Sequence, residues 1–160
     1  MFTGSEIAAT IANLGVTHVM WVADSTTGPW EAALESSPNI CLIRVCREGE
    51  AWPLAAGLHL GGKSPLIIMQ STGLFESGDA LRNVCFDLKL PIFALIGVRN
   101  ELVADSRDSA RRFAEPVLKA WGLRYVWLRT PDDKAKLAEH FHACQRNRCA
   151  GAVLMAEGPA

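Results

Sequence analysis

The sequence predicts an α/β fold, namely a doubly wound, mainly parallel six-stranded sheet with helices on both faces. Short apolar or β-rich runs alternate with helical stretches along the 160 residues. Several of these runs are apolar at successive positions, which is typical of strands that are buried on both faces of a sheet. Alternating strands and helices favour parallel crossovers, which place helices on both sides of the sheet. We expect residues 1–160 to form one domain, because this length suits a single core.

The expected elements follow one another with short connections. The first helix is capped by Thr3 or Ser5, carries apolar residues at helical spacing and stops at Gly15. A second helix opens at Pro29, and a third, rich in small residues, starts near Glu48. The expected strands are residues 16–23, 39–46, 64–70, 90–98, 124–128 and 150–157, and the later helices are residues 74–89, 107–121 and 132–147.

Charge and composition exclude several classes of partner. The chain has 16 lysines and arginines against 17 acidic residues, so a net charge of -1 gives no electrostatic reason to expect a nucleic acid or an anionic membrane as partner. The sequence shows no basic leader followed by an apolar segment, and no apolar run reaches the length of a bilayer. We therefore expect a cytoplasmic protein.

The five cysteines are odd in number and lie among apolar residues, which indicates reduced thiols rather than a disulfide scaffold. Cys144 and Cys149 lie near His140 and His142, which raises the alternative of a metal site. Their spacing differs from the close pairs of a zinc knuckle, so we expect no metal bound by this chain alone.

Ligands of parallel sheets usually bind beyond the carboxyl ends of the strands. The loops that follow Val22, Cys46, Gln70 and Val98 are therefore the candidate site.

The first of these loops contains the polar residues Asp24, Ser25, Thr26 and Thr27. Such side chains bind a ligand or cap the helix that follows, and both alternatives stay open.

Glu48 stands where a strand gives way to a helix, a position that faces the ligand crevice in a parallel sheet. Glu50, two residues later, should point elsewhere. An acidic residue in the first helical turn also stabilises the helix dipole, so a purely structural role for Glu48 is the alternative. Pro53 is compatible with this helix only if it lies in the first turn or if the helix kinks there.

The turn after the third strand supplies Gln70, Ser71, Thr72 and Gly73. Gly73 allows the backbone to approach a ligand closely, although a plain turn between a strand and a helix favours the same residue types. The sequence contains no phosphate-loop lysine pattern, no G-x-G-x-x-G after a strand and no G-x-S-x-G elbow. Ordinary nucleotide binding and serine hydrolysis are therefore disfavoured.

Four segments together resemble the pyrimidine-binding domain of thiamine-diphosphate enzymes. They are "VADS", "REGEAWPLAAGLHLGGKSPLIIMQSTGL", "LPIFALIGVRNE" and, more weakly, "AEPVLKAWGLRY". The resemblance is greatest to the sulfopyruvate decarboxylase α subunit and to the matching half of phosphonopyruvate decarboxylase. It spans nearly the whole chain.

The resemblance implies that Glu48 takes the place of the family's glutamate that hydrogen-bonds the cofactor pyrimidine, whereas Glu50 does not. That hydrogen bond favours the imino tautomer needed for proton removal from the thiazolium ring, and a 2-oxo acid is then decarboxylated. We expect the remaining site residues to bind the cofactor (Gln70, Ser71, Thr72 and Gly73) or the substrate (Asp24, Ser25 and Arg99). For Arg99 the alternative to binding the substrate is an ion pair with Glu101.

The resemblance also implies a partner. These enzymes bind the diphosphate through Mg²⁺ in a second domain with a Gly-Asp-Gly turn, and this sequence contains no such turn. We therefore expect a diphosphate-binding β subunit that holds Mg²⁺ and the diphosphate, in a homo- or hetero-oligomer.

Four residues depart from the pattern of the relatives: Arg47 precedes Glu48, Phe75 and Glu76 replace a small Gly and an Asn, and Pro53 interrupts a helix. Arg47 should favour the ionised form of Glu48, and Phe75 and Glu76 should add bulk and negative charge near the substrate. The alternatives to a decarboxylase subunit are therefore a non-catalytic interaction protein of the same fold and an unrelated small-ligand binder.

Overall fold

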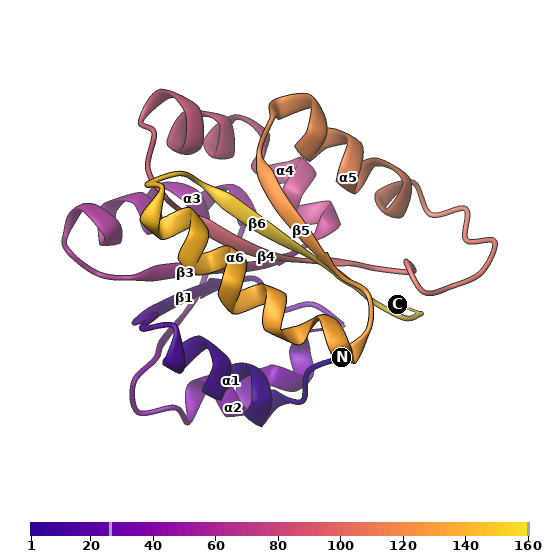
Figure 1. Ribbon diagram of the computed structural model, residues 1–160, viewed down its shortest axis with the longest axis horizontal. Helices are drawn as coiled ribbons and strands as arrows, with labels where there is room; N and C mark the ends of the chain where they lie inside the picture. The colour runs from indigo at the N-terminus through magenta and orange to yellow at the C-terminus, as the bar shows by residue number, and fades with distance from the viewer. Residues whose placement is uncertain (26, 160) are drawn as a thin grey trace.

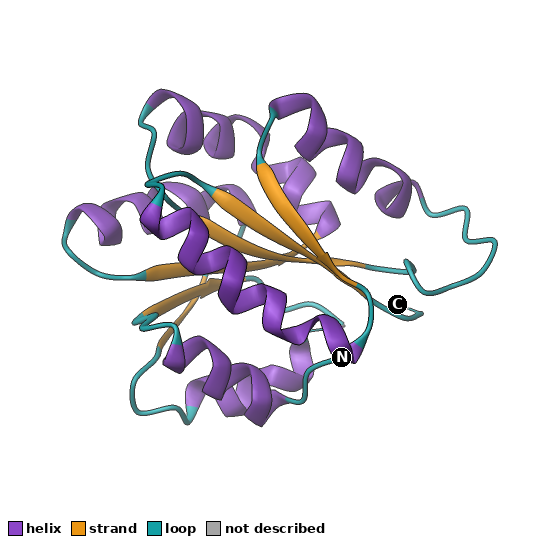
Figure 2. Ribbon diagram, viewed as in Figure 1, coloured by secondary structure: helices purple, strands orange, loops and turns teal. Residues whose placement is uncertain are grey.

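The computed structural model describes residues 1–25 and 27–159. Its centre is a six-stranded sheet in the order β2-β1-β3-β4-β6-β5, and every neighbouring pair is parallel (Figures 1 and 2). This confirms the predicted doubly wound α/β fold. The strands are β1 (His18–Trp21), β2 (Cys41–Arg44), β3 (Pro65–Gln70), β4 (Phe93–Val98), β5 (Arg124–Leu128) and β6 (Gly151–Ala156).

Each of the predicted strands contains one observed strand, and the predicted helices are also present. The α-helices are α1 (Gly4–Asn13), α2 (Glu31–Glu35), α3 (Glu48–Leu60), α4 (Ser71–Arg82), α5 (Ser109–Trp121) and α6 (Ala135–Arg146). Shorter helical turns are η1 (Gly28–Trp30), η2 (Asn83–Asp87) and η3 (Pro131–Lys134).

Helix starts are set by local capping. Of the two candidate caps of α1, Thr3 is the residue used: its hydroxyl accepts a hydrogen bond from the Glu6 N–H, and the Glu6 carboxylate accepts one from the Thr3 N–H in return. Helix α4 begins at Ser71, earlier than the predicted start at residue 74, because Gln70 both ends β3 and caps α4.

Pro53 is the sixth residue of α3 and so lies beyond its first turn. Of the two conditions that the sequence set, a first-turn position or a kink, the first is not met. Proline has no N–H and its ring crowds the carbonyl four residues earlier, which here belongs to Gly49.

Two apolar layers cover the sheet (Figure 1). Helices α1, α2 and α6 bury Ile7, Leu34 and Leu137 against one face. Helices α3, α4 and α5 bury a second set that includes Trp52 and Leu118 against the other face. Each fully buried aliphatic side chain of this kind contributes about 1.5–3 kcal/mol relative to exposure.

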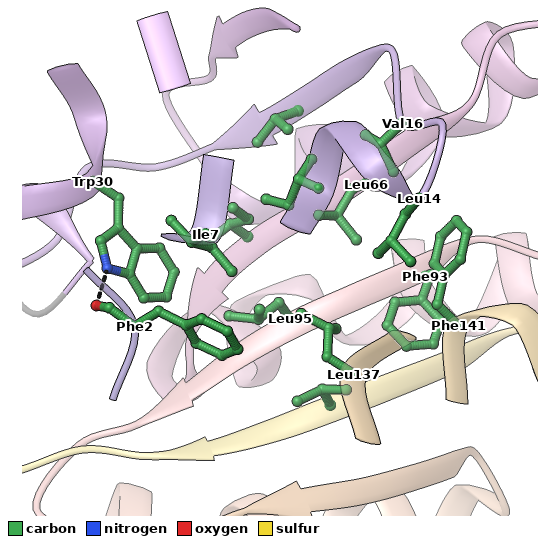
Figure 3. Close-up of a cluster of buried hydrophobic side chains, with 14 of the residues drawn as sticks. Phe2, Ile7, Leu14, Val16, Trp30, Leu66, Phe93, Leu95, Leu137 and Phe141 are labelled. Carbon is green, nitrogen blue, oxygen red and sulfur yellow. Dashed lines mark hydrogen bonds between the residues drawn. The ribbon is translucent and has the colours of Figure 1, made fainter. Parts of the chain in front are cut away.

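The first layer reaches the start of the chain, as Figure 3 shows. The Trp30 indole N–H donates to the Phe2 carbonyl over 3.1 Å. Phe93 of β4 meets Phe141 of α6 edge to face, with ring centroids 5.2 Å apart. These contacts fix α1, α2 and α6 as one layer.

The His140–Cys149 region is part of this packing. The Cys144 sulfur lies 3.7 Å from His140 Nε2, and burial raises the pKa of the Cys144 thiol to about 12. Across residues 1–25 and 27–159, no group of three or more His, Cys, Asp or Glu side chains is arranged to hold a metal ion. None of the helices in this same part of the chain is both long and apolar enough to cross a membrane.

Candidate functional site

The strand order reverses beside β1: the chain passes from β1 to β2 on one side and then to β3 on the other. In open parallel sheets the crevice at such a switch point is the usual ligand site. The residues that follow these strands therefore meet at one edge of the sheet. They come from the turn after β1, the start of α3 and the start of α4.

Glu48 and Gly73 are in direct contact at this edge. Glu48 is the first residue of α3, after an extended Arg47, and Gly73 lies in the first turn of α4. A Cβ atom at position 73 would lie 2.7 Å from Glu48 Oε1. The absence of a side chain at Gly73 therefore makes the room that the half-buried Glu48 side chain occupies.

The Glu48 carboxylate has unused hydrogen-bonding capacity. Considering residues 1–25 and 27–159, no hydrogen bond or ion pair involves its oxygens. Glu50 behaves differently, since its Oε2 accepts a hydrogen bond from the Cys46 N–H over 3.2 Å. Glu50 thus bonds back to the segment that enters α3, as expected of a residue that points away from the crevice, whereas the Glu48 oxygens stay available.

The turn between β3 and α4 brings the other predicted cofactor residues to the same place. Ser71 is fully buried, and its hydroxyl has no partner among the residues that the structure describes. Thr72 is exposed, and Gln70 is half-buried at the end of β3. Together with Gly73 these residues form the first turn of α4, where backbone N–H groups and the helix dipole favour an acceptor or anion.

Arg47 and Glu76, two of the departures from the relatives, are bonded to each other. Arg47 Nε lies 2.9 Å from Glu76 Oε1, and the Gly49 N–H donates to Glu76 Oε2 over 2.5 Å. The Gly49 hydrogen bond and the Arg47 guanidinium lower the pKa of the Glu76 carboxyl. The guanidinium is therefore paired with Glu76, not with Glu48.

The turn after β1 uses its acidic residue structurally. Asp24 accepts from the Thr27 N–H over 2.7 Å and from the Thr27 hydroxyl over 2.5 Å. The same hydroxyl accepts from the Trp21 indole N–H over 2.9 Å. Asp24 thus caps the turn, which is the alternative left open by the sequence, and Thr26 lies outside the described residues.

Ser25 is exposed and lines a cavity of about 350 Å³ at the same edge of the sheet. Arg129 and Glu157, neither of which the sequence singled out, line this cavity as well. Glu157 directly follows β6, is 6% exposed and lies against Gly97 of β4. An acidic residue immediately after an apolar strand is the signal that would have marked it.

Arg99, the predicted substrate residue after β4, is bonded within its own loop. Its Nε lies 2.7 Å from Asp108 Oδ2, and this contact lowers the pKa of the Asp108 carboxyl. The alternative partner Glu101 is wrong, because Glu101 instead lies 3.2 Å from Arg111 and 3.6 Å from Arg129. The Arg99 side chain is 36% exposed.

No family model matches the chain, but comparison with known proteins finds relatives in sequence and in fold. The sulfopyruvate decarboxylase subunit alpha of Methanocaldococcus jannaschii is 28% identical over 109 residues, which cover 67% of this chain and 64% of that protein. The phosphonopyruvate decarboxylase of Streptomyces viridochromogenes is 27% identical over 148 residues, which cover 91% of this chain and 37% of that protein. The chain thus spans less than two thirds of either relative.

Among solved structures, benzoylformate decarboxylase from Polynucleobacter necessarius matches with a TM-score of 0.76. It is 20% identical, and the match covers 98% of this chain and 30% of that one. At this identity the likeness concerns the fold. A putative thiamin diphosphate-dependent enzyme from Mycobacterium smegmatis matches with a TM-score of 0.71 at 17% identity, over 99% of this chain and 30% of that one. In sequence the chain is similar to sulfopyruvate decarboxylase α subunits and phosphonopyruvate decarboxylases, and its fold is similar to part of these two solved structures.

Proposed function

We propose that this chain, as a single pyrimidine-binding domain, is the α-type subunit of a thiamine-diphosphate-dependent 2-oxo acid decarboxylase. The main support for the proposal is the contact between the Glu48 side chain and Gly73 at the switch point of the sheet. Glu48 presents a carboxylate with no protein partner among the described residues, over the one position in the first turn of α4 that has no side chain. The relation to named decarboxylases supports the assignment.

The residues at this edge fit the pyrimidine end of the cofactor. An aminopyrimidine has ring nitrogens and an exocyclic amine. A carboxyl group can hydrogen-bond a ring nitrogen, and Glu48 supplies this carboxyl. The other polar groups of the ring need neutral donors and acceptors, and the buried Ser71 hydroxyl, which has no partner in the described chain, is one of these. The exposed Thr72 and the backbone around Gly73 complete a small polar surface.

Glu48 would hold a proton at the pyrimidine ring nitrogen and so favour the imino form of the ring. When bound, the cofactor would supply the electron sink that takes up the electron pair left behind as a 2-oxo acid loses carbon dioxide. The chain's part is to orient the ring, exclude water from one side of it and keep the Glu48 carboxyl at hydrogen-bonding distance.

Magnesium and the diphosphate belong, in this proposal, to a partner β subunit. Mg²⁺ needs an octahedron of oxygen ligands, and residues 1–25 and 27–159 assemble no acidic cluster that would begin one. The relatives' designation as subunit alpha supports the partner. The active enzyme is then a hetero-oligomer, and this chain alone is inactive.

The substrate is proposed to be a small 2-oxo acid, with Ser25 and Arg99 at the open side of the site. Both side chains are accessible at the carboxyl edge of the sheet. Asp24 is the weaker member of the predicted set, since Thr27 uses both of its carboxylate oxygens.

A native mass spectrum tests the proposal. The tagged chain is recovered from its own cells in buffer with Mg²⁺ and thiamine diphosphate. A stoichiometric second chain together with cofactor mass is the expected result, and a screen of 2-oxo acids, including sulfopyruvate and phosphonopyruvate, follows. Glu48→Gln should abolish turnover in that complex and leave assembly intact. Self-assembly without cofactor would instead favour the non-catalytic interaction protein of the same fold.

A further inference from the structure

The residues on both sides of Glu48 are bonded to one carboxylate of the neighbouring helix. Glu76 of α4 accepts from the Gly49 N–H over 2.5 Å through Oε2, and from Arg47 Nε over 2.9 Å through Oε1. Gly49 follows Glu48 and Arg47 precedes it. We call this arrangement the Glu76 bridge.

Glu76 lies one helical turn after Gly73, the residue against which the Glu48 side chain rests. Residues three positions apart lie on the same face of a helix. One face of α4 therefore makes two contacts with the start of α3: Gly73 receives the Glu48 side chain, and Glu76 fixes the backbone and the cation beside it. The two helices are tied together at the point from which Glu48 projects.

The bridge also determines where the Arg47 charge goes. The Arg47 side chain is 72% exposed and has a flexible stem, so it can reach another carboxylate if Glu76 is removed. Glu48 is the adjacent residue, and Glu50 is already engaged by the Cys46 N–H. A guanidinium on Glu48 would draw that carboxylate away from Gly73 and occupy the oxygens that a ligand needs.

We propose that Glu76 is a positioning residue for Glu48, which acts by anchoring Gly49 and by keeping the Arg47 guanidinium away from the Glu48 carboxylate. This inference rests on the proposed function for its catalytic consequence. The position of Glu48 itself is measurable without partner or cofactor. In this account Arg47 disturbs Glu48 only when Glu76 is absent.

The test uses Glu76→Ala, Arg47→Ala/Glu76→Ala and, as matched control, Asp79→Ala. Asp79 is another acidic residue of α4, its side chain is 86% exposed, and it pairs with Arg82 rather than with α3. A Glu76→Gln variant retains the shape of the side chain and one acceptor oxygen, so it should fold even if Glu76→Ala does not. We expect its effect on the position of Glu48 to be smaller than that of Glu76→Ala.

The first readout is the nuclear Overhauser effect between the Glu48 γ-protons and the Gly73 α-protons in the free chain. We expect it to be strong in the wild type and in Asp79→Ala, largely lost in Glu76→Ala, and partly recovered in the double variant. Equal intensity in Glu76→Ala and the wild type would overturn the inference. Equal loss in the single and double variants would also overturn it, because Glu76 would then be only a helix cap.

The second readout is turnover by the assembled complex with thiamine diphosphate and Mg²⁺. Glu76→Ala should lower kcat about tenfold with KM for the 2-oxo acid little changed, since a displaced catalytic group costs rate rather than binding. The double variant should recover part of kcat. If the wild-type complex has no turnover while the Overhauser pattern holds, the proposed function fails and the positioning of Glu48 by Glu76 stands. If turnover is present and Glu76→Ala leaves it unchanged, the inference fails alone.

Discussion

Gly73→Ala should disable the site without unfolding the chain. A Cβ atom at position 73 would lie 2.7 Å from Glu48 Oε1 and 2.8 Å from Glu48 Cδ, whereas ordinary van der Waals contact begins at 3.4 Å. Glu48 Cγ would lie closer still, so the Glu48 side chain must retreat by at least about 0.7 Å or leave the contact. A displacement of about 1 Å of a reacting group can cost about 100-fold in rate, so turnover by the assembled complex should fall by roughly this factor.

The free energy of unfolding of Gly73→Ala should rise slightly or stay the same, although its turnover falls. Alanine is favoured over glycine in a helix by about 0.8–1 kcal/mol, and a half-buried Glu48 side chain can rotate toward solvent. Gly57→Ala is the matched control, because Gly57 lies within α3 and a Cβ there would meet nothing within 4 Å. Thermal unfolding of the free chains and steady-state turnover of the complexes give the comparison. Equal turnover for Gly73→Ala and Gly57→Ala would refute the reasoning.

Three further predictions concern the scaffold. Thr27→Val should lower the free energy of unfolding by about 1–3 kcal/mol in urea titrations, because it leaves the buried Trp21 indole N–H without its acceptor and removes one hydrogen bond to the Asp24 carboxylate; a loss below about 0.5 kcal/mol would contradict this. The pKa of Glu6 is lowered to about 2 by the Thr3 N–H and Lys134, so its contribution to stability is present above pH 4.5 and is lost as the pH falls toward 2. Glu6→Gln should therefore flatten the decline of the unfolding temperature over this range, and an unchanged decline would count against it. Burial raises the pKa of the Cys85 thiol to about 12, so brief alkylation followed by mass spectrometry should modify exposed Cys41 and spare Cys85; the reverse order would be inconsistent with this burial.

The sheet with helices on both faces could be predicted from sequence, because buried strands are recognisable from local runs of apolar residues. The runs that became β4 and β6 are apolar at every position, and both strands are completely buried. The start of α4 was misplaced because Gln70 is an unusual N-cap and gives no side-chain capping bond. Pro53 lies inside α3, which the local preference of proline for the first helical turn does not predict.

The candidate site could be predicted only in part. Glu48 and Gly73 were both singled out, since each follows a strand end, but their contact joins residues on different helices. The partner of Arg99 depends on the path of an irregular loop, so the alternative of an ion pair with Glu101 was wrong and Asp108 was not anticipated. Arg47 and Glu76 are 29 positions apart, and in sequence each looks like a separate charge that disturbs the site around Glu48. Only the packing of α3 against α4 shows that their charges offset each other.

The place of β6 between β4 and β5 has a consequence for how the chain folds as it is made. Because β5 pairs with β6 and not with β4, it has no neighbour in the sheet until the last strand of the chain is available. Strand insertion into the middle of a parallel sheet requires contacts between distant residues, which form slowly. A nascent chain that ends before β6 would leave the backbone N–H and C=O groups along one edge of β4 unpaired, so the completed sheet must form after synthesis has passed residue 156.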